Sequence, residues 1–208
     1  MKQTLDISQW PRKDHYHFFR QFEEPFFGVT LKVDCTRAYE QAKEKQLSFF
    51  LYYLYQSLAA ANKTEPFRYR IAGDEVLLYD QVHASPVINR PDGTFGFAYM
   101  DYHDNFESFL QQARAEVKQV QESTGLIPAV SGENVIHYSA MPWLDFTSVS
   151  HARAFSFKDS CPKITFGKMT TGERGRRTMP VAIHVHHALM DGFHVGKFAT
   201  LFQELMDQ

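Results

Sequence analysis

The chain has 208 residues, of which 44% are hydrophobic and 22% are charged, and its formal net charge is −2. This length and composition suit one globular domain, residues 1–208, and the small net charge gives no electrostatic case for a nucleic-acid or membrane partner. No stretch approaches the roughly 18 apolar residues of a membrane span, and the N-terminus lacks the apolar core of a signal peptide.

The first half of the chain predicts a long helix followed by a hairpin. Residues 36–62 open on Thr36, a candidate N-cap, and their apolar second half is typical of a buried helix. Residues 67–80 alternate in hydrophobicity and predict a hairpin that turns at Gly73 and Asp74. Further strands are expected near residues 83–90 and 94–101.

The second half predicts two amphipathic helices among several strands. The spacing of apolar residues indicates helices over 104–123 and 192–206. Period-two alternation predicts strands near residues 133–139, 147–157, 163–170 and 178–187. The basic stretch TTGERGRR, between the last two strands, favours a solvated hairpin tip. Strands mixed with a few long helices indicate an α+β fold, in which helices cover a largely antiparallel mixed sheet.

Residues 184–194, HVHHALMDGFH, place three of the ten histidines of the chain within four positions. Strand alternation puts His187 at the end of an apolar row and puts His184 and His186 on the opposite face. His187 is therefore expected at the edge of the core, where a desolvated imidazole is held still and stays uncharged and basic at neutral pH. A general base needs these properties.

Other interpretations of this stretch stay open. Asp191 directly precedes the last helix, where an aspartate commonly serves as N-cap. His184 and His186 form an H-x-H pair that could bind a metal, although no third ligand is apparent. Cys35 and Cys161 have neither metal-like nor redox spacing, so we expect free thiols in a reducing compartment, by default the cytoplasm.

The stretch HHALMDGFHVGKF resembles the HHxxxDGFHV signature of chloramphenicol acetyltransferases. The looser HHxxxDG is shared with the catalytic cores of dihydrolipoamide acyltransferases and with peptide-synthetase condensation domains. Further stretches are similar to the same family, in the same order and at nearly the same spacing: LDISQWPRKDHYHFF, FRYRIAGDEVLLYDQVH, YHDNFESFL, YSAMPWLDFTS and ITFGK. The resemblance thus covers essentially the whole chain.

This resemblance implies a chloramphenicol acetyltransferase-like, CoA-dependent acyltransferase fold and a homotrimer with active sites at the subunit interfaces. It implies acetyl-CoA as co-substrate and no metal. His187 would be the general base that takes a proton from the acceptor hydroxyl, which attacks the thioester directly. Ser139 would donate a hydrogen bond to the oxyanion, and Thr165 would hold a water near the intermediate. Asp191 would pair with Arg12 and so fix the turn that carries His187.

The positions that match the family's acceptor pocket depart from its apolar character. Phe19, Phe27 and Phe95 keep that character. His137 and Lys163 replace uncharged residues, and Glu23 stands where a leucine is usual. Val149, His151 and Arg153 share one face of the expected strand 147–157. Unpaired cations are costly to bury, so either these side chains point outward or the acceptor is polar and even anionic.

On the coenzyme side, Lys168 matches a lysine of the family that binds CoA. Ser48 stands where another lysine usually meets a CoA phosphate, although Lys45 is near it in sequence.

The leading hypothesis is an acetyl-CoA-dependent O-acetyltransferase for chloramphenicol or a similar small alcohol. An acetyltransferase for a more polar or anionic acceptor is the main alternative. A core of the dihydrolipoamide type is disfavoured, because no lipoyl domain or linker precedes this fold. A non-catalytic acyl-CoA or small-molecule binding protein is disfavoured too, because a binding module has no use for a poised base. A metal protein is the weakest hypothesis.

Overall fold

The computed structural model describes residues 1–126 and 132–208. The strands are β1 (Lys2–Thr4), β2 (Phe26–Asp34), β3 (Tyr69–Ala72), β4 (Glu75–Tyr79), β5 (His83–Asn89), β6 (Phe95–Phe97), β7 (Val135–Ala140), β8 (Lys163–Phe166), β9 (Thr170–Thr171) and β10 (Arg177–His186). The α-helices are α1 (Lys13–Phe19), α2 (Thr36–Glu44), α3 (Phe49–Lys63), α4 (Phe106–Glu122) and α5 (Gly192–Met206). None of the described helices is long and apolar enough to cross a membrane.

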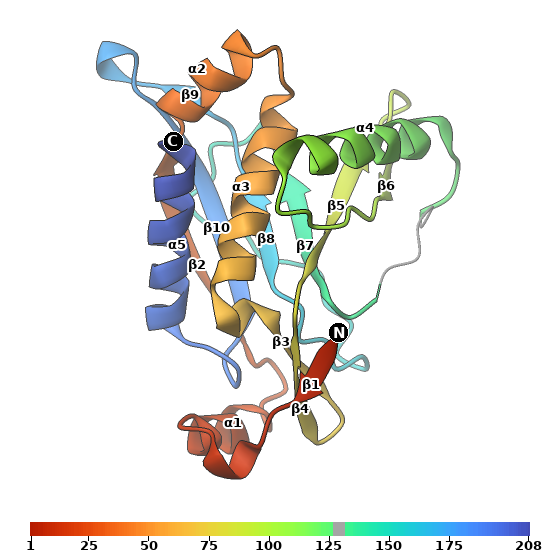
Figure 1. Cartoon of the computed structure of the whole chain (residues 1–208), viewed down its shortest axis with the longest axis vertical. Coiled ribbons are helices and arrows are strands. Elements are labelled where there is room, and N and C mark those ends of the chain that lie inside the picture. Colours follow the sequence, from red (N-terminus) through yellow and green to blue (C-terminus); the bar gives the residue numbers. More distant parts are fainter. Residues whose placement is uncertain (127–131) are drawn as a thin grey trace.

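The main sheet has the strand order β2-β10-β8-β7-β5-β6, and β9 pairs with β10. The pairs β2–β10 and β10–β8 are antiparallel, whereas β8–β7 and β7–β5 are parallel pairs. Helices α3 and α5 cover one face of this sheet, and α4 lies near its β5–β6 end (Figure 1). Strands β1, β4 and β3 form a second, small sheet. The predicted α+β class is correct, with a parallel centre that the sequence pattern did not indicate.

Helix α3 forms the middle of the core, as its apolar sequence predicts. Leu54 and Leu58 are fully buried, and they belong to the same core cluster as Phe166 of β8 and Phe198 and Phe202 of α5. Packing of α3 and α5 on one face holds β8 and β10 in place, and these strands lead to the residues of the candidate site.

The long helix expected over residues 36–62 is wrong, because the chain turns between α2 and α3. Gln46 has a φ of 53°, in the left-handed region that breaks a helix. Ser48 then caps α3 by accepting a hydrogen bond from the Leu51 amide at 3.4 Å. Thr36 is not the cap of α2, since the Asp34 side chain accepts from the Thr36 amide at 3.0 Å. No glycine or proline marks the break, so composition hides it.

The strand expected over residues 147–157 is also wrong, because the described chain makes no strand there. Both neighbouring positions of β8 are already occupied by β10 and β7, so no free edge remains beside it. Strands 94–101 and 163–170 are shorter than expected, ending at Phe97 and Phe166. The hairpin at Gly73 is confirmed by the β3–β4 pairing and by a φ of 61° at that glycine.

Candidate active site

His187 follows the last residue of β10 and is held from several sides. Its backbone amide donates to the carbonyl of Pro25 at 2.8 Å. Its ring stacks on Phe19 with centroids 3.9 Å apart and meets the Phe27 ring at 4.6 Å. Nδ1 lies 3.2 Å from the carbonyl oxygen of Met190, which can only accept, so Nδ1 carries the hydrogen. The lone pair is therefore on Nε2, in the tautomer that a base requires.

Asp191 stabilises the turn that carries His187. Its side chain caps α5 by accepting from the Phe193 amide at 3.0 Å, and it forms an ion pair with Arg12. Arg12 also donates to the carbonyl of His187 at 3.2 Å. Burial alone would raise the pKa of Asp191, but hydrogen bonds and charge from Arg12 and His194 outweigh it and hold this pKa below its ordinary value. Asp191 is thus both a helix cap and the partner of Arg12.

Ser139 and Thr165 face each other across the parallel pair β7–β8. Ser139, His137, His151 and Lys163 line a cavity of about 370 Å³. Thr165 is fully buried, and its hydroxyl lies 3.4 Å from Nε2 of His151. Ser139 therefore lines the cavity directly, and Thr165 lies next to it through its contact with His151.

His187 lies far from this cavity within the same chain. Thr165 pairs with Ala182 of β10, and His187 is five residues beyond Ala182. That separation corresponds to about 16 Å along the strand. One copy of the chain therefore does not bring the expected base and the expected oxyanion donor together.

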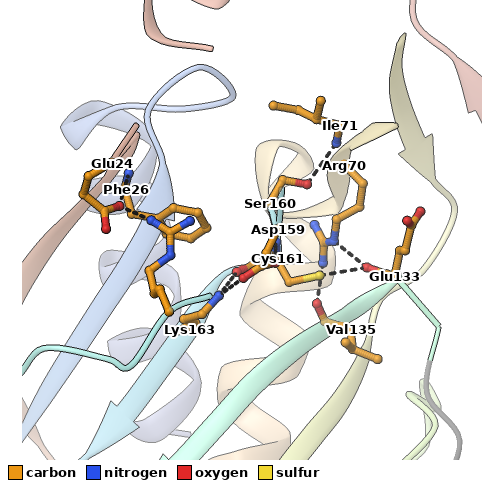
Figure 2. A network of polar contacts seen from close by, with 11 residues as sticks. Glu24, Phe26, Arg70, Ile71, Glu133, Val135, Asp159, Ser160, Cys161 and Lys163 are labelled. Carbon is orange, nitrogen blue, oxygen red and sulfur yellow. Dashed lines mark hydrogen bonds and ion pairs between the residues drawn. The ribbon is translucent and has the colours of Figure 1, made fainter. Parts of the chain in front are cut away.

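Both cations of the pocket are paired with carboxylates, Lys163 as a buried and Arg153 as a half-buried side chain, an outcome that neither sequence alternative foresaw. Lys163 forms an ion pair with Asp159 and donates to the carbonyl of Cys161 at 3.1 Å, and Figure 2 shows its side chain reaching these groups. Arg153 pairs with Glu24, whereas Glu23, which stands where the family usually has a leucine, is exposed.

The aromatic ring of Phe26 supports both pairs. The guanidinium of Arg153 lies 3.9 Å and the Nζ of Lys163 lies 4.6 Å from its centroid. The cations therefore point neither outward nor into the cavity as free charges. Sequence reasoning missed the residues that neutralise and support them: Glu24, Phe26 and Asp159.

The histidines around the cavity are uncharged at neutral pH. Burial lowers the pKa of His137, His151 and His186 to about 4 each, assisted by nearby cations and imidazoles. Burial also lowers the pKa of His184. The ring of His184 meets the edge of the His151 ring at 4.7 Å and occupies the space where a Cβ on Gly28 would stand, 2.4 Å from Nε2. Glycine at this position is what leaves room for the imidazole.

Residues 1–203 match the sequence profile of the family described as chloramphenicol acetyltransferase. The chain is 32% identical to a chloramphenicol acetyltransferase of Klebsiella sp. over 206 residues, which cover 99% of this chain and 94% of the relative. The chain belongs to the chloramphenicol acetyltransferase family. It is accordingly an acyltransferase of the chloramphenicol O-acetyltransferase type.

Solved structures agree with membership of the chloramphenicol acetyltransferase family. A structure of a chloramphenicol acetyltransferase superposes with a TM-score of 0.90 at 35% identity, covering 99% of this chain and 100% of the other. A probable dihydrolipoamide acetyltransferase from Listeria monocytogenes superposes with a TM-score of 0.64 at 14% identity, covering 93% of this chain and 88% of the other. The second likeness shows the fold alone. The fold is the CoA-dependent acyltransferase fold that the resemblance implied.

The remaining residues expected to bind the acceptor or CoA lie at the end of the sheet, in a segment without strand structure, or at the surface. Phe95 is 44% exposed on β6, at the end of the sheet. Val149 is half-buried within the segment that forms no strand, and Lys168 is exposed just after β8. Ser85 and Phe97 also line the cavity of Ser139, and no motif marked them beforehand.

His184 and His186, the weakest of the sequence alternatives as a metal site, gain no third ligand among the described residues. Nδ1 of His186 instead accepts from the Ala188 amide at 3.2 Å. The described residues that do gather ligand atoms are His137, Asp159 and Cys161, whose ligand atoms lie within 4.8 Å of one another.

Two cations lie next to the cluster of His137, Asp159 and Cys161. Lys163 pairs with Asp159, and the positive charge of the fully buried Arg70 acts on Cys161. Arg70 joins β3 to the start of β7 by donating to the carbonyls of Glu133 at 2.7 Å and Val135 at 2.6 Å (Figure 2). These charges oppose a bound dication.

Because these histidines are uncharged in the folded protein, we expect the folded protein to lose stability in acid. His137, His151 and His186 have pKa values of about 4 in the folded protein against a reference of 6.5, so the unfolded chain binds more protons between these limits. The free energy of unfolding should therefore fall as the pH is lowered from 6.5 to 4. Thermal unfolding followed by circular dichroism should show Tm dropping through this window, with a shallower drop in His137→Leu. Equal Tm values at both ends would contradict the prediction.

Proposed function

We propose that the protein is an acetyl-CoA-dependent O-acetyltransferase for a hydroxyl of chloramphenicol or a similar small alcohol. The observation that carries the proposal is the state of His187. Its ring is stacked on Phe19, its Nδ1–H is bound to the carbonyl of Met190, and its Nε2 lone pair is left free. A fixed imidazole with an available lone pair fits a general base.

In the proposed reaction, Nε2 of His187 takes the proton of the acceptor hydroxyl as its oxygen attacks the thioester carbon. The hydroxyl of Ser139 donates a hydrogen bond to the oxygen that becomes negative. Collapse of the tetrahedral intermediate breaks the carbon–sulfur bond, and the imidazolium of His187 returns its proton to the leaving thiolate. Thr165 would hold a water near the intermediate, while Arg12 and Asp191 position the turn.

Acetyl-CoA enters this proposal as the co-substrate that the family uses. Lys168, exposed beyond β8, is the residue that we assign to a CoA phosphate. Ser48 caps α3 and has no charge to offer a phosphate. The pocket residues Phe95, Val149, His137 and His151 would meet the acceptor.

We further propose a homotrimer in which each active site lies between two copies. The separation of about 16 Å along the strand between His187 and the row of Ser139 supports this, because a second copy must then supply one of the two groups. Exposed aromatic side chains beside the pocket, Phe155 and Phe157, each 67% exposed, offer apolar surface for such a contact. Cys35 and Cys161 are buried free thiols, which fits a cytoplasmic location.

The test is release of the CoA thiol from acetyl-CoA with and without chloramphenicol. Fast release that requires the drug is expected and would support both the reaction and the acceptor. Slow release independent of the drug would keep the thioester chemistry and remove chloramphenicol as acceptor. Binding of acetyl-CoA without any release, over a panel of small alcohols, would overturn the proposal in favour of a binding protein.

A further inference from the structure

A second cavity of about 420 Å³ adjoins the cavity of Ser139, and His137, Ala152 and Lys163 line both. The lining of the first cavity is of two kinds. Imidazoles, hydroxyls and one ammonium group come from β5, β7, β8 and residue 151, whereas Val87, Phe97 and Ala98 are apolar. A molecule that fills this space needs polar groups on one side and an apolar surface on the other.

Two of the cations around the two cavities are paired with carboxylates, while Lys158 at the second cavity is exposed to solvent. Lys163 is held by Asp159, and Arg153 is held by Glu24. The Lys163–Asp159 pair is largely withdrawn from solvent, with side chains 10% and 16% exposed, whereas Arg153 is 12% exposed and its partner Glu24 is 47% exposed. An anionic ligand would have to compete with a carboxylate already in place for either cation. This arrangement disfavours the anionic acceptor that the sequence left open.

The imidazoles leave hydrogen-bonding capacity unused. The ring of His137 makes no hydrogen bond to any described residue, and His151 makes only the 3.4 Å contact with Thr165. Because both rings are uncharged at neutral pH, each offers one N–H donor and one lone pair. A hydroxyl also donates and accepts, so it satisfies such a ring. A carboxylate only accepts, and an ammonium only donates.

We propose that the acceptor is an uncharged, hydroxyl-rich ring, such as a neutral pyranoside, and that His137 and His151 determine this specificity. The proposal rests on the proposed function, because it takes the cavity of Ser139 as the acceptor site. The hydroxyls of the ring reach the two imidazoles, and its apolar C–H face packs on Val87 and Phe97. The hydroxyl that is acetylated lies beside Ser139.

The experiment compares three acceptors with acetyl-CoA and the full chain: methyl glucopyranoside, the corresponding uronate, and chloramphenicol. We expect kcat/KM for the neutral sugar to exceed that for the uronate by about tenfold or more, because the uronate adds a negative charge and Lys163, the cation that lines the first cavity, is already paired with Asp159. His137→Leu and His151→Leu should lower the value for the neutral sugar by about 10- to 100-fold, since its hydroxyls lose their partners. His15→Leu, at an exposed histidine on α1, is the matched control and should change nothing.

A second variant tests the charge argument directly. Asp159→Asn leaves Lys163 without its carboxylate partner, so the preference should move toward the uronate by about tenfold. The double variant Asp159→Asn with Lys163→Met removes the freed cation and should restore the preference for the neutral sugar. Equal preferences in wild type and Asp159→Asn would overturn the charge argument.

The two proposals fail in different ways. Preference of the wild type for chloramphenicol or the uronate, with turnover that His187→Ala abolishes, would overturn the acceptor class and leave the reaction standing. Turnover of none of the three acceptors above the level of His187→Ala would overturn the reaction for them. In that case calorimetry compares the binding of the neutral sugar with that of the uronate. A neutral sugar that binds no more tightly than the uronate would overturn the proposed acceptor class.

Discussion

Replacing His187 with alanine is expected to lower kcat for acetyl transfer by a factor of roughly 10²–10⁴, the usual contribution of a general base. The expectation follows from geometry. The Phe19 ring fixes the plane of the imidazole and the Met190 carbonyl fixes its tautomer, so the lone pair of Nε2 is held ready without any other partner to occupy it. The measurement is thiol release from acetyl-CoA at saturating acceptor.

The control for this variant is His15→Ala, which removes an exposed imidazole from α1 and should leave kcat unchanged. Circular dichroism and Tm should show that His187→Ala stays folded, because its neighbours Phe19 and Phe27 keep their own packing. A variant that retains the wild-type rate would remove His187 from the base role. The Arg12–Asp191 pair would then be a structural brace only.

Much of the fold could be predicted where hydrophobic periodicity is strong. Helices α4 and α5 and strand β10 lie where the spacing of apolar residues placed them, because one buried face dictates each pattern. Residues 147–157 alternate equally well yet form no strand, because pairing requires a free neighbouring edge that a local pattern cannot report. The turn between α2 and α3 is hidden for a related reason: its backbone is determined by packing and not by residue type.

In the candidate site, too, some residues could be predicted from local sequence and others could not. The resemblance to the family suggested roles for His187, Ser139 and Thr165, and strand alternation predicted His187 at the end of an apolar row. The partners that neutralise the pocket could not be found this way. Arg153 pairs with Glu24, 129 residues earlier in the chain, and nothing local marks that glutamate. The charge of the pocket therefore depends on tertiary contacts. Its cations alone suggest an anionic acceptor, and their pairing with carboxylates disfavours one.

Replacing Ser139 with alanine is expected to lower kcat by a factor of roughly 10²–10³, the cost of removing one donor to a developing oxyanion. KM for acetyl-CoA should change little, because the hydrogen bond forms mainly as the charge develops. Ser139→Thr keeps a hydroxyl and is the matched variant, expected to retain more activity than Ser139→Ala. A loss in Ser139→Ala that appears only in KM would place Ser139 in binding and not in stabilisation of the intermediate.

Mixing the two inactive variants tests where the active site is assembled. His187→Ala still carries Ser139, and Ser139→Ala still carries His187, so a site formed between one copy of each contains both groups. If sites lie between copies, co-expression of the two variants at equal levels should restore about a quarter of the sites, the fraction of interfaces with both groups intact in a cyclic assembly. Co-expression of His187→Ala with the double variant His187→Ala/Ser139→Ala should restore none. Recovery in the first mixture alone requires base and donor to come from different copies, as the distance along β10 demands. No recovery would require a chain movement of that distance, which the pairing of β10 with both β2 and β8 opposes.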